Sequence, residues 1–119
     1  MPVVFNQKVG RVVIRETANA TYTIAGNTSQ SNVITTDGRE TTVAGASIQK
    51  IIWTSNGYWT VARGANTILN LPGSNNVDFD AMNCPLNEYP AATLVITLNG
   101  ASAVGSILIV LAKDSQPVP

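Results

Sequence analysis

The sequence predicts an all-β fold: a single-domain β-sandwich or small antiparallel barrel of about seven to nine short strands, with extended N- and C-terminal segments. Val, Ile and Thr together supply 36 of the 119 residues. These β-branched side chains pack well on a pleated surface and carry a small cost in a helix. Short alternating segments are separated by Gly, Pro and Asn, and no run of ten residues has the helical period.

The chain length suits one domain. A chain of 12.5 kDa buries roughly two-thirds of its unfolded surface, which is enough for one core without disulfides. We expect an extended N-terminal arm over residues 1–7, a sandwich or barrel over 8–112 and a Pro-rich tail over 113–119. Proline lacks the N–H that a sheet ladder needs, so the tail is expected to leave the sheet.

The first half of the domain alternates in short segments. Lys8–Glu16 and Ala20–Ala25 each place different side chains on their two faces, which is typical of half-buried strands. Two short strands, Asn32–Thr36 and Glu40–Ala44, flank Asp37-Gly38, a dipeptide that favours a hairpin.

The clearest predicted hairpin joins Ser47–Thr54 to Tyr58–Arg63 through Asn56-Gly57. Asn-Gly tolerates the positive φ angles of a type I′ turn. The register of such a hairpin places Trp53 and Trp59 on opposite faces. One tryptophan is then expected in the core, and the other against a second layer, a partner or solvent.

The second half contains three further strands and one irregular stretch. Asn66–Leu71 ends at Pro72-Gly73, and the last two strands are Thr93–Asn99 and Ser106–Ala112. Gly73–Ala91 is predicted to be a long ordered loop with a short edge strand at Val77–Asp80. Within the last strand, residues 108–111 are continuously apolar, which predicts burial on both faces.

Composition excludes several classes of function. Seven basic residues balance seven acidic ones, so no net charge attracts nucleic acid or an anionic membrane. Without histidine, and with one cysteine, the chain excludes His-based triads, most zinc sites and internal disulfides. Charged residues make up 12%, about half the usual share. We therefore expect no enzyme, no catalytic residue and no cofactor.

Two short motifs invite a chemical interpretation. Asp78-Phe79-Asp80 would direct two carboxylates to one side of a strand, where calcium is conceivable, but the further oxygens and glycine of usual calcium loops are missing. A solvated edge strand protected by charge is the simpler interpretation. Cys84 has no histidine to activate it, so a reduced structural thiol is expected. No metal site is predicted.

No segment predicts secretion or membrane insertion. The N-terminus lacks a basic region before an apolar stretch. The longest apolar window, Ala101–Ala112, has twelve residues, whereas a membrane helix needs about 20.

Candidate partner-binding residues lie in two places. The arm residues Pro2, Val3, Val4 and Phe5 could lie across a neighbouring subunit. The aromatic residues Trp53, Tyr58 and Trp59 could contact a partner or stack on a sugar ring. A carbohydrate-binding module therefore remains an alternative function.

The chain resembles small β-rich structural proteins of tailed bacteriophage virions. The likeness is carried by the missing histidine, the Asn/Thr/Ser/Gly-rich strands, the arm Pro2–Phe5 and the aromatic segment Ile52–Trp59. It implies a head decoration or cement protein, located in the virion, that stabilises a protein shell through arm and β-surface contacts. A neck or tail component is the alternative. The implied partners are a major capsid protein and further copies of the chain, with a trimer favoured.

Overall fold

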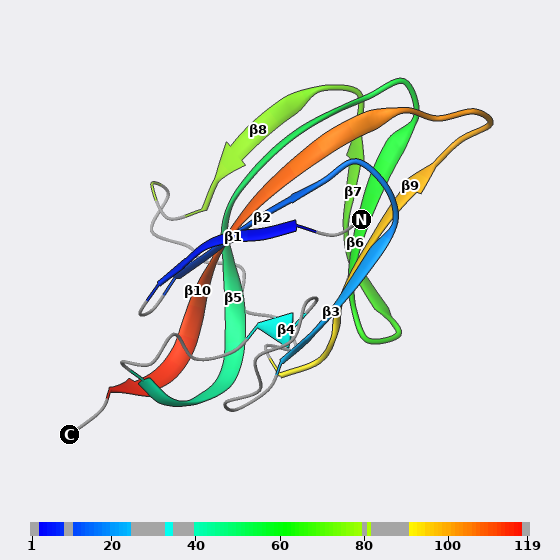
Figure 1. The fold of residues 1–119 in the computed structure, drawn as a ribbon. Coiled ribbons are helices and arrows are strands. Elements are labelled where there is room, and N and C mark those ends of the chain that lie inside the picture. Colours follow the sequence, from blue (N-terminus) through cyan, green and yellow to red (C-terminus); the bar gives the residue numbers. More distant parts are fainter. Residues whose placement is uncertain are drawn as a thin grey trace.

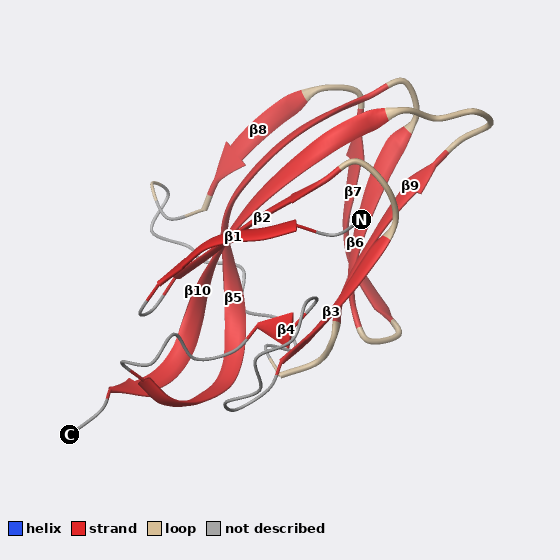
Figure 2. Cartoon of the chain, viewed as in Figure 1, coloured by secondary structure: helices blue, strands red, loops and turns tan. Residues whose placement is uncertain are grey.

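The computed structural model describes the backbone of residues 3–8, 11–24, 33–34, 40–79, 81 and 91–117, and the side chains of residues 11–22, 45–79, 81 and 91–114. The described chain contains ten strands and no helix (Figure 2). The strands are β1 Val3–Lys8, β2 Arg11–Glu16, β3 Ala20–Ile24, β4 Val33–Ile34, β5 Glu40–Ser55, β6 Tyr58–Arg63, β7 Asn66–Pro72, β8 Asn75–Asp78, β9 Leu94–Asn99 and β10 Gly105–Pro117.

The strands form two sheets that pack as a sandwich (Figure 1). Sheet A has the order β1-β2-β10-β5-β8, and sheet B has the order β4-β3-β9-β6-β7. The described pairings are antiparallel apart from a short parallel one between β3 and β4. The predicted all-β, single-domain sandwich is thereby confirmed.

The path of the chain between the sheets is that of a jelly roll. Among the connections that the structure describes in full, four cross from one sheet to the other: β2 to β3, β5 to β6, β7 to β8 and β9 to β10. Since each one joins the ends of strands at the same side of the sandwich, we call this side the crossover end. The order β2-β10-β5-β8 in sheet A and the order β3-β9-β6-β7 in sheet B are those of the eight-stranded, double-sheet jelly roll. β1 and β4 each add one strand at the edge of a sheet.

The predicted hairpin at Asn56-Gly57 is wrong. β5 pairs with β10 and β8 in sheet A, whereas β6 pairs with β7 and β9 in sheet B. Neither Asn56 nor Gly57 has the positive φ of a type I′ turn. Instead, Asn56 ties two crossovers together: its N–H donates to the Val104 carbonyl oxygen (3.2 Å), and its Oδ1 accepts from the Val104 N–H (2.9 Å).

Other strand pairings and boundaries also differ from the predictions. β4 pairs in parallel with β3 in sheet B, and not with β5; the turn at Asp37-Gly38 lies outside the described residues. The expected arm contains β1, which adds to sheet A beside β2. The expected tail continues β10 as far as Pro117, opposite Glu40, with a register shift before it. A strand tolerates proline at its end or at such an irregularity.

The core lies between the inner faces of the two sheets. Its buried apolar residues come from both: Val12, Ile14, Ala46, Ile48, Ile51, Trp53, Ile107, Ile109 and Leu111 from sheet A, and Ala20, Tyr22, Trp59, Val61, Leu71, Leu94 and Ile96 from sheet B. Both tryptophans therefore belong to one core, contrary to the predicted opposite faces. Their faces were assigned from a hairpin that does not form.

The two indoles also bridge the sheets reciprocally. Trp59 in sheet B donates through Nε1 to the Thr54 carbonyl oxygen in sheet A (3.1 Å). Trp53 in sheet A donates through Nε1 to the Pro72 carbonyl oxygen in sheet B (3.1 Å). Each bond satisfies the one polar atom that a buried indole carries.

Charged side chains also enter the interior. The Glu16 carboxylate in β2 accepts a hydrogen bond from the Tyr22 hydroxyl in β3. Arg63 in β6 donates to the carbonyl oxygens of Ala46 (2.7 Å) and Ala92 (3.0 Å). Burial lowers the pKa of Arg63, since desolvation disfavours the charged form. These bonds connect the sheets with polar contacts that the alternating pattern alone does not specify.

Replacing Tyr22 with phenylalanine is expected to lower the free energy of unfolding by about 1–3 kcal/mol. The change keeps the ring and removes the hydroxyl that donates to buried Glu16, so the carboxylate loses a donor. Urea denaturation compares Tyr22→Phe with Thr21→Ala, at the exposed neighbouring position. Equal stability of Tyr22→Phe and the unaltered chain would contradict this role.

Candidate functional site

The outer face of sheet A carries an apolar strip across its three central strands. The strip consists of Val13 in β2, Leu108 and Val110 in β10 and Ile52 in β5. Val13 is the cross-strand partner of Val110, and Ile52 is the partner of Leu108, so the four side chains adjoin on one face. Ile52 is 45% exposed, and the other three are partly exposed.

The strip contradicts the predicted burial of residues 108–111 on both faces. Ile109 and Leu111 point into the core, whereas Leu108 and Val110 point outward and remain partly exposed. A continuously apolar strand is typical of sheets covered on both sides. In the described part of this chain, the core covers one side of β10, and Leu108 and Val110 remain partly exposed on the other.

Charged side chains border the strip. Arg11 and Arg15 flank Val13 along β2, and both are exposed. On the other side, Lys50 in β5 pairs in register with Asp78 in the edge strand β8. An apolar centre with a polar rim is the usual anatomy of a protein–protein interface.

The arm residues of the sequence prediction lie beside this face in the strand order. Val3, Val4 and Phe5 belong to β1, and Phe5 is in register with Val13 of the strip. Pro2 lies outside the described residues. The structure therefore places the residues of the predicted extended arm in the same sheet as the apolar strip.

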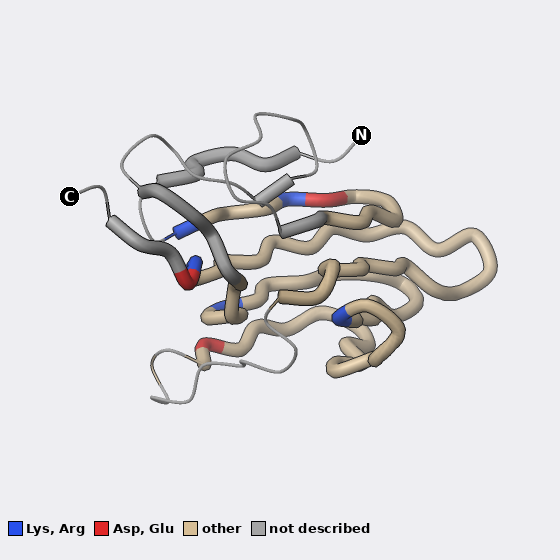
Figure 3. Tube along the Cα trace, turned by 90° about the horizontal axis from the view of Figure 1, so that it is seen from below, with Lys and Arg blue, Asp and Glu red and all other residues tan. Residues whose placement is uncertain are grey.

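The outer face of sheet B has a different character. Its five strands contain one charged residue, Arg63, and that side chain points into the core. Charged positions are sparse along the whole described chain (Figure 3). We call the outward residues near the crossover end the Tyr58 platform: Tyr58 and Thr60 in β6, Asn70 and Pro72 in β7, and Thr97 and Asn99 in β9.

Asn99 organises the platform. Its Nδ2 lies within hydrogen-bond distance of the Tyr58 carbonyl oxygen (3.4 Å), Thr60 Oγ1 (3.2 Å) and the Thr97 carbonyl oxygen (3.1 Å). Because the amide nitrogen faces the sheet, Oδ1 is left to accept a hydrogen bond from outside. Tyr58, the residue beside it, is 40% exposed. No sequence motif singled out Asn99; the signal was the lack of charge in these strands.

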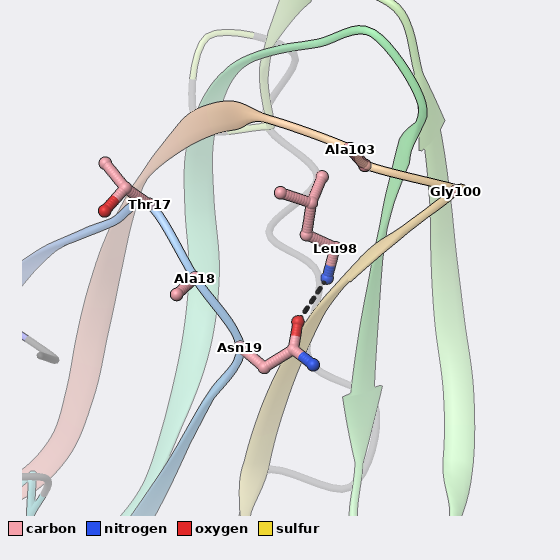
Figure 4. Close-up of a pocket in the computed structure, with 6 residues that line it drawn as sticks. All are labelled: Thr17, Ala18, Asn19, Leu98, Gly100 and Ala103. Atoms are coloured by element: carbon pink, nitrogen blue, oxygen red, sulfur yellow. Dashed lines mark hydrogen bonds between the residues drawn. The ribbon is translucent and has the colours of Figure 1, made fainter.

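A shallow pocket of about 410 Å³ lies at the crossover end (Figure 4). It is lined by Thr17, Ala18, Asn19, Leu98, Gly100 and Ala103. Asn19 Oδ1 accepts a hydrogen bond from the Leu98 N–H (2.7 Å), which joins the β2–β3 connection to β9. No titratable side chain is among these lining residues, so they supply no general acid or general base.

Of the three aromatic candidates, Tyr58 is the exposed one. Trp53 and Trp59 are 9% and 0% exposed, so neither indole ring is presented at the surface.

The acidic motif and the cysteine are only partly described. Asp78 ends β8, and its Oδ1 accepts a hydrogen bond from the Ala81 N–H (2.9 Å). Asp80 and Cys84 lie outside the described residues. Within the described ranges, no three His, Cys, Asp or Glu residues gather as metal ligands.

No family model, curated protein or solved structure matches this chain. The part of the chain that the structure describes has no helix long and apolar enough to cross a membrane.

Proposed function

We propose that the protein is a non-enzymatic assembly protein that docks onto a larger protein shell through the outer face of sheet A, as a decoration or cement protein of a virion does. The observation that carries the proposal is the apolar strip Val13, Ile52, Leu108 and Val110, partly exposed on the central strands of a sheet. Covering such surface stabilises a complex by about 25 cal/mol per Å² of apolar area.

Two further features support this function. The arm strand β1 extends the same sheet and is in register with the strip, so arm and strip could contact one neighbour together. The jelly-roll strand order also occurs in viral capsid domains. Since one fold serves many functions, the exposed strip on sheet A supports this function more strongly than the jelly-roll strand order does.

Replacing Ile52 with arginine is expected to weaken binding to the shell at least about tenfold, because the new charge must be desolvated at an apolar contact. Particles purified from the source are first analysed by quantitative mass spectrometry for the copy number of this chain. Particles stripped of the chain are then titrated with the unaltered protein and with Ile52→Arg.

Asn70→Arg is the matched control, since it adds the same charge at an exposed position of sheet B. It is expected to bind as the unaltered protein does. The proposal is rejected if purified particles lack the chain, or if Ile52→Arg rebinds with unchanged affinity. Light scattering of the free protein tests the expected trimer.

A further inference from the structure

We infer that the Tyr58 platform on sheet B is a second binding site, and that its ligand is a neutral saccharide. The site lies on the outer face opposite the apolar strip, so it does not depend on the proposed docking function. The inference rests on three properties of the platform: an exposed aromatic ring, polar groups held in a fixed orientation, and the absence of charge.

The ring of Tyr58 supplies an apolar face. Its side chain points outward from β6, between Asn99 in β9 and Pro72 in β7, which are its cross-strand partners. A tyrosine ring offers a large rigid contact area at a low cost in side-chain entropy. The C–H face of a pyranose ring is apolar and flat enough to stack on such a surface.

The neighbouring polar groups match sugar hydroxyls. Asn99 Nδ2 is held by acceptors of the sheet, and among the described residues none donates to its Oδ1. Thr60 Oγ1 accepts from Asn99, so the Thr60 hydroxyl proton is available to donate. One acceptor and one donor are therefore oriented beside the ring before a ligand binds, which reduces the entropy cost of binding.

The absence of charge selects the ligand class. Strands β3, β4, β6, β7 and β9 carry no outward charged residue, so a phosphate, sulfate or carboxylate group would find no counter-charge on them. Apart from the Tyr58 ring, the platform residues are small or polar, so the platform lacks the cluster of large apolar side chains that forms the centre of a protein interface. A hydroxyl-rich neutral ligand satisfies the exposed amide and hydroxyl groups without desolvating an ion.

The test is a titration of the ¹⁵N-labelled full chain, followed by NMR, with neutral hexasaccharides of glucose, mannose and N-acetylglucosamine at up to about 10 mM, the range suited to a shallow open site. At least one probe is expected to shift the Asn99 side-chain amide and the Tyr58 and Thr60 backbone amides. Binding is expected to be insensitive to salt, because no ion pair forms.

Tyr58→Ala is expected to weaken binding about tenfold or more, whereas Tyr58→Phe keeps the ring and most of the affinity. Asn76→Ala, at an exposed position of β8 in sheet A, is the control and should bind normally. Circular dichroism verifies that each variant folds.

Dextran sulfate serves as the anionic comparison probe. The inference is overturned if no neutral probe shifts these resonances, if the shifts persist in Tyr58→Ala, or if dextran sulfate binds and the neutral probes do not. Particle rebinding by Tyr58→Ala should remain normal, which separates this site from the proposed function.

Discussion

Trp59→Ala is expected to lower the free energy of unfolding by about 3–5 kcal/mol, a large share of the roughly 5–15 kcal/mol that holds a domain of this size folded. The Trp59 side chain is 0% exposed and is flanked in register by Leu71 and Leu98. Its removal leaves a cavity between the sheets and also deletes the bond from Nε1 to the Thr54 carbonyl oxygen.

Equilibrium denaturation in guanidinium chloride, followed by circular dichroism, measures this loss. Tyr58→Ala is the matched control, because it truncates the adjacent aromatic residue of the same strand, whose side chain points outward. The control is expected to cost about 1 kcal/mol or less. A loss of under 1 kcal/mol for Trp59→Ala would show that the indole does not form part of a packed core.

Gly57→Ala is expected to destabilise the protein by about 3 kcal/mol, near the upper end of the cost of overpacking. A Cβ atom at Gly57 would lie 2.1 Å from the Asn99 carbonyl oxygen and 3.3 Å from Ala103 Cβ. The first contact is with backbone, which cannot move without disturbing the end of β9. The crossover between β5 and β6 therefore requires glycine for close approach and not for a special φ angle.

Gly73→Ala is the informative comparison. Gly73 has a φ of +66°, yet no atom lies within 4 Å of the Cβ that alanine would add. Its cost is therefore the left-handed backbone alone, about 1–2 kcal/mol. Thermal denaturation is expected to rank the unaltered chain above Gly73→Ala and Gly73→Ala above Gly57→Ala. The reverse order of the two variants would contradict the close approach at Gly57.

The two outer faces of the sandwich differ in chemistry in a way that suits two different contacts. Sheet A combines an apolar strip with a charged rim that includes Arg15 and Lys50. Sheet B presents hydroxyl and amide groups around Tyr58 with no outward charge on its strands. Because the two faces lie on opposite sides of the sandwich, the proposed docking on sheet A and the proposed saccharide site on sheet B do not compete for the same surface.

Most strands could be predicted from local pattern. The alternation predicts strands at Lys8–Glu16, Ala20–Ala25 and Tyr58–Arg63, and the structure has strands there at Arg11–Glu16, Ala20–Ile24 and Tyr58–Arg63, with Lys8 in β1 instead. The edge strand expected at Val77–Asp80 begins two residues earlier, as β8 at Asn75–Asp78. Side chains two residues apart share a face whatever the partner strand is, so alternation survives any change in topology.

Strand partners could not be predicted in the same way. Asn56-Gly57 favours a hairpin locally, but β5 pairs with β10 and β6 pairs with β9. Both of these partner strands lie far along the chain. The reciprocal indole bonds of Trp53 and Trp59 form only once the two sheets face each other. For the candidate sites, Tyr58 was recognisable as an exposed aromatic candidate, whereas Asn99 became part of the platform only through its pairing with β6.

The sequence by itself determined the all-β class, the single domain and most strand positions, because stiff β-branched residues and turn-forming residues act over a few neighbours. The tertiary structure alone decided which strands pair, that both tryptophans enter one core, and that half of the apolar run at residues 108–111 faces outward. These outcomes depend on contacts between distant segments, whose free energies are set by the packing of the two sheets and not by any local pattern.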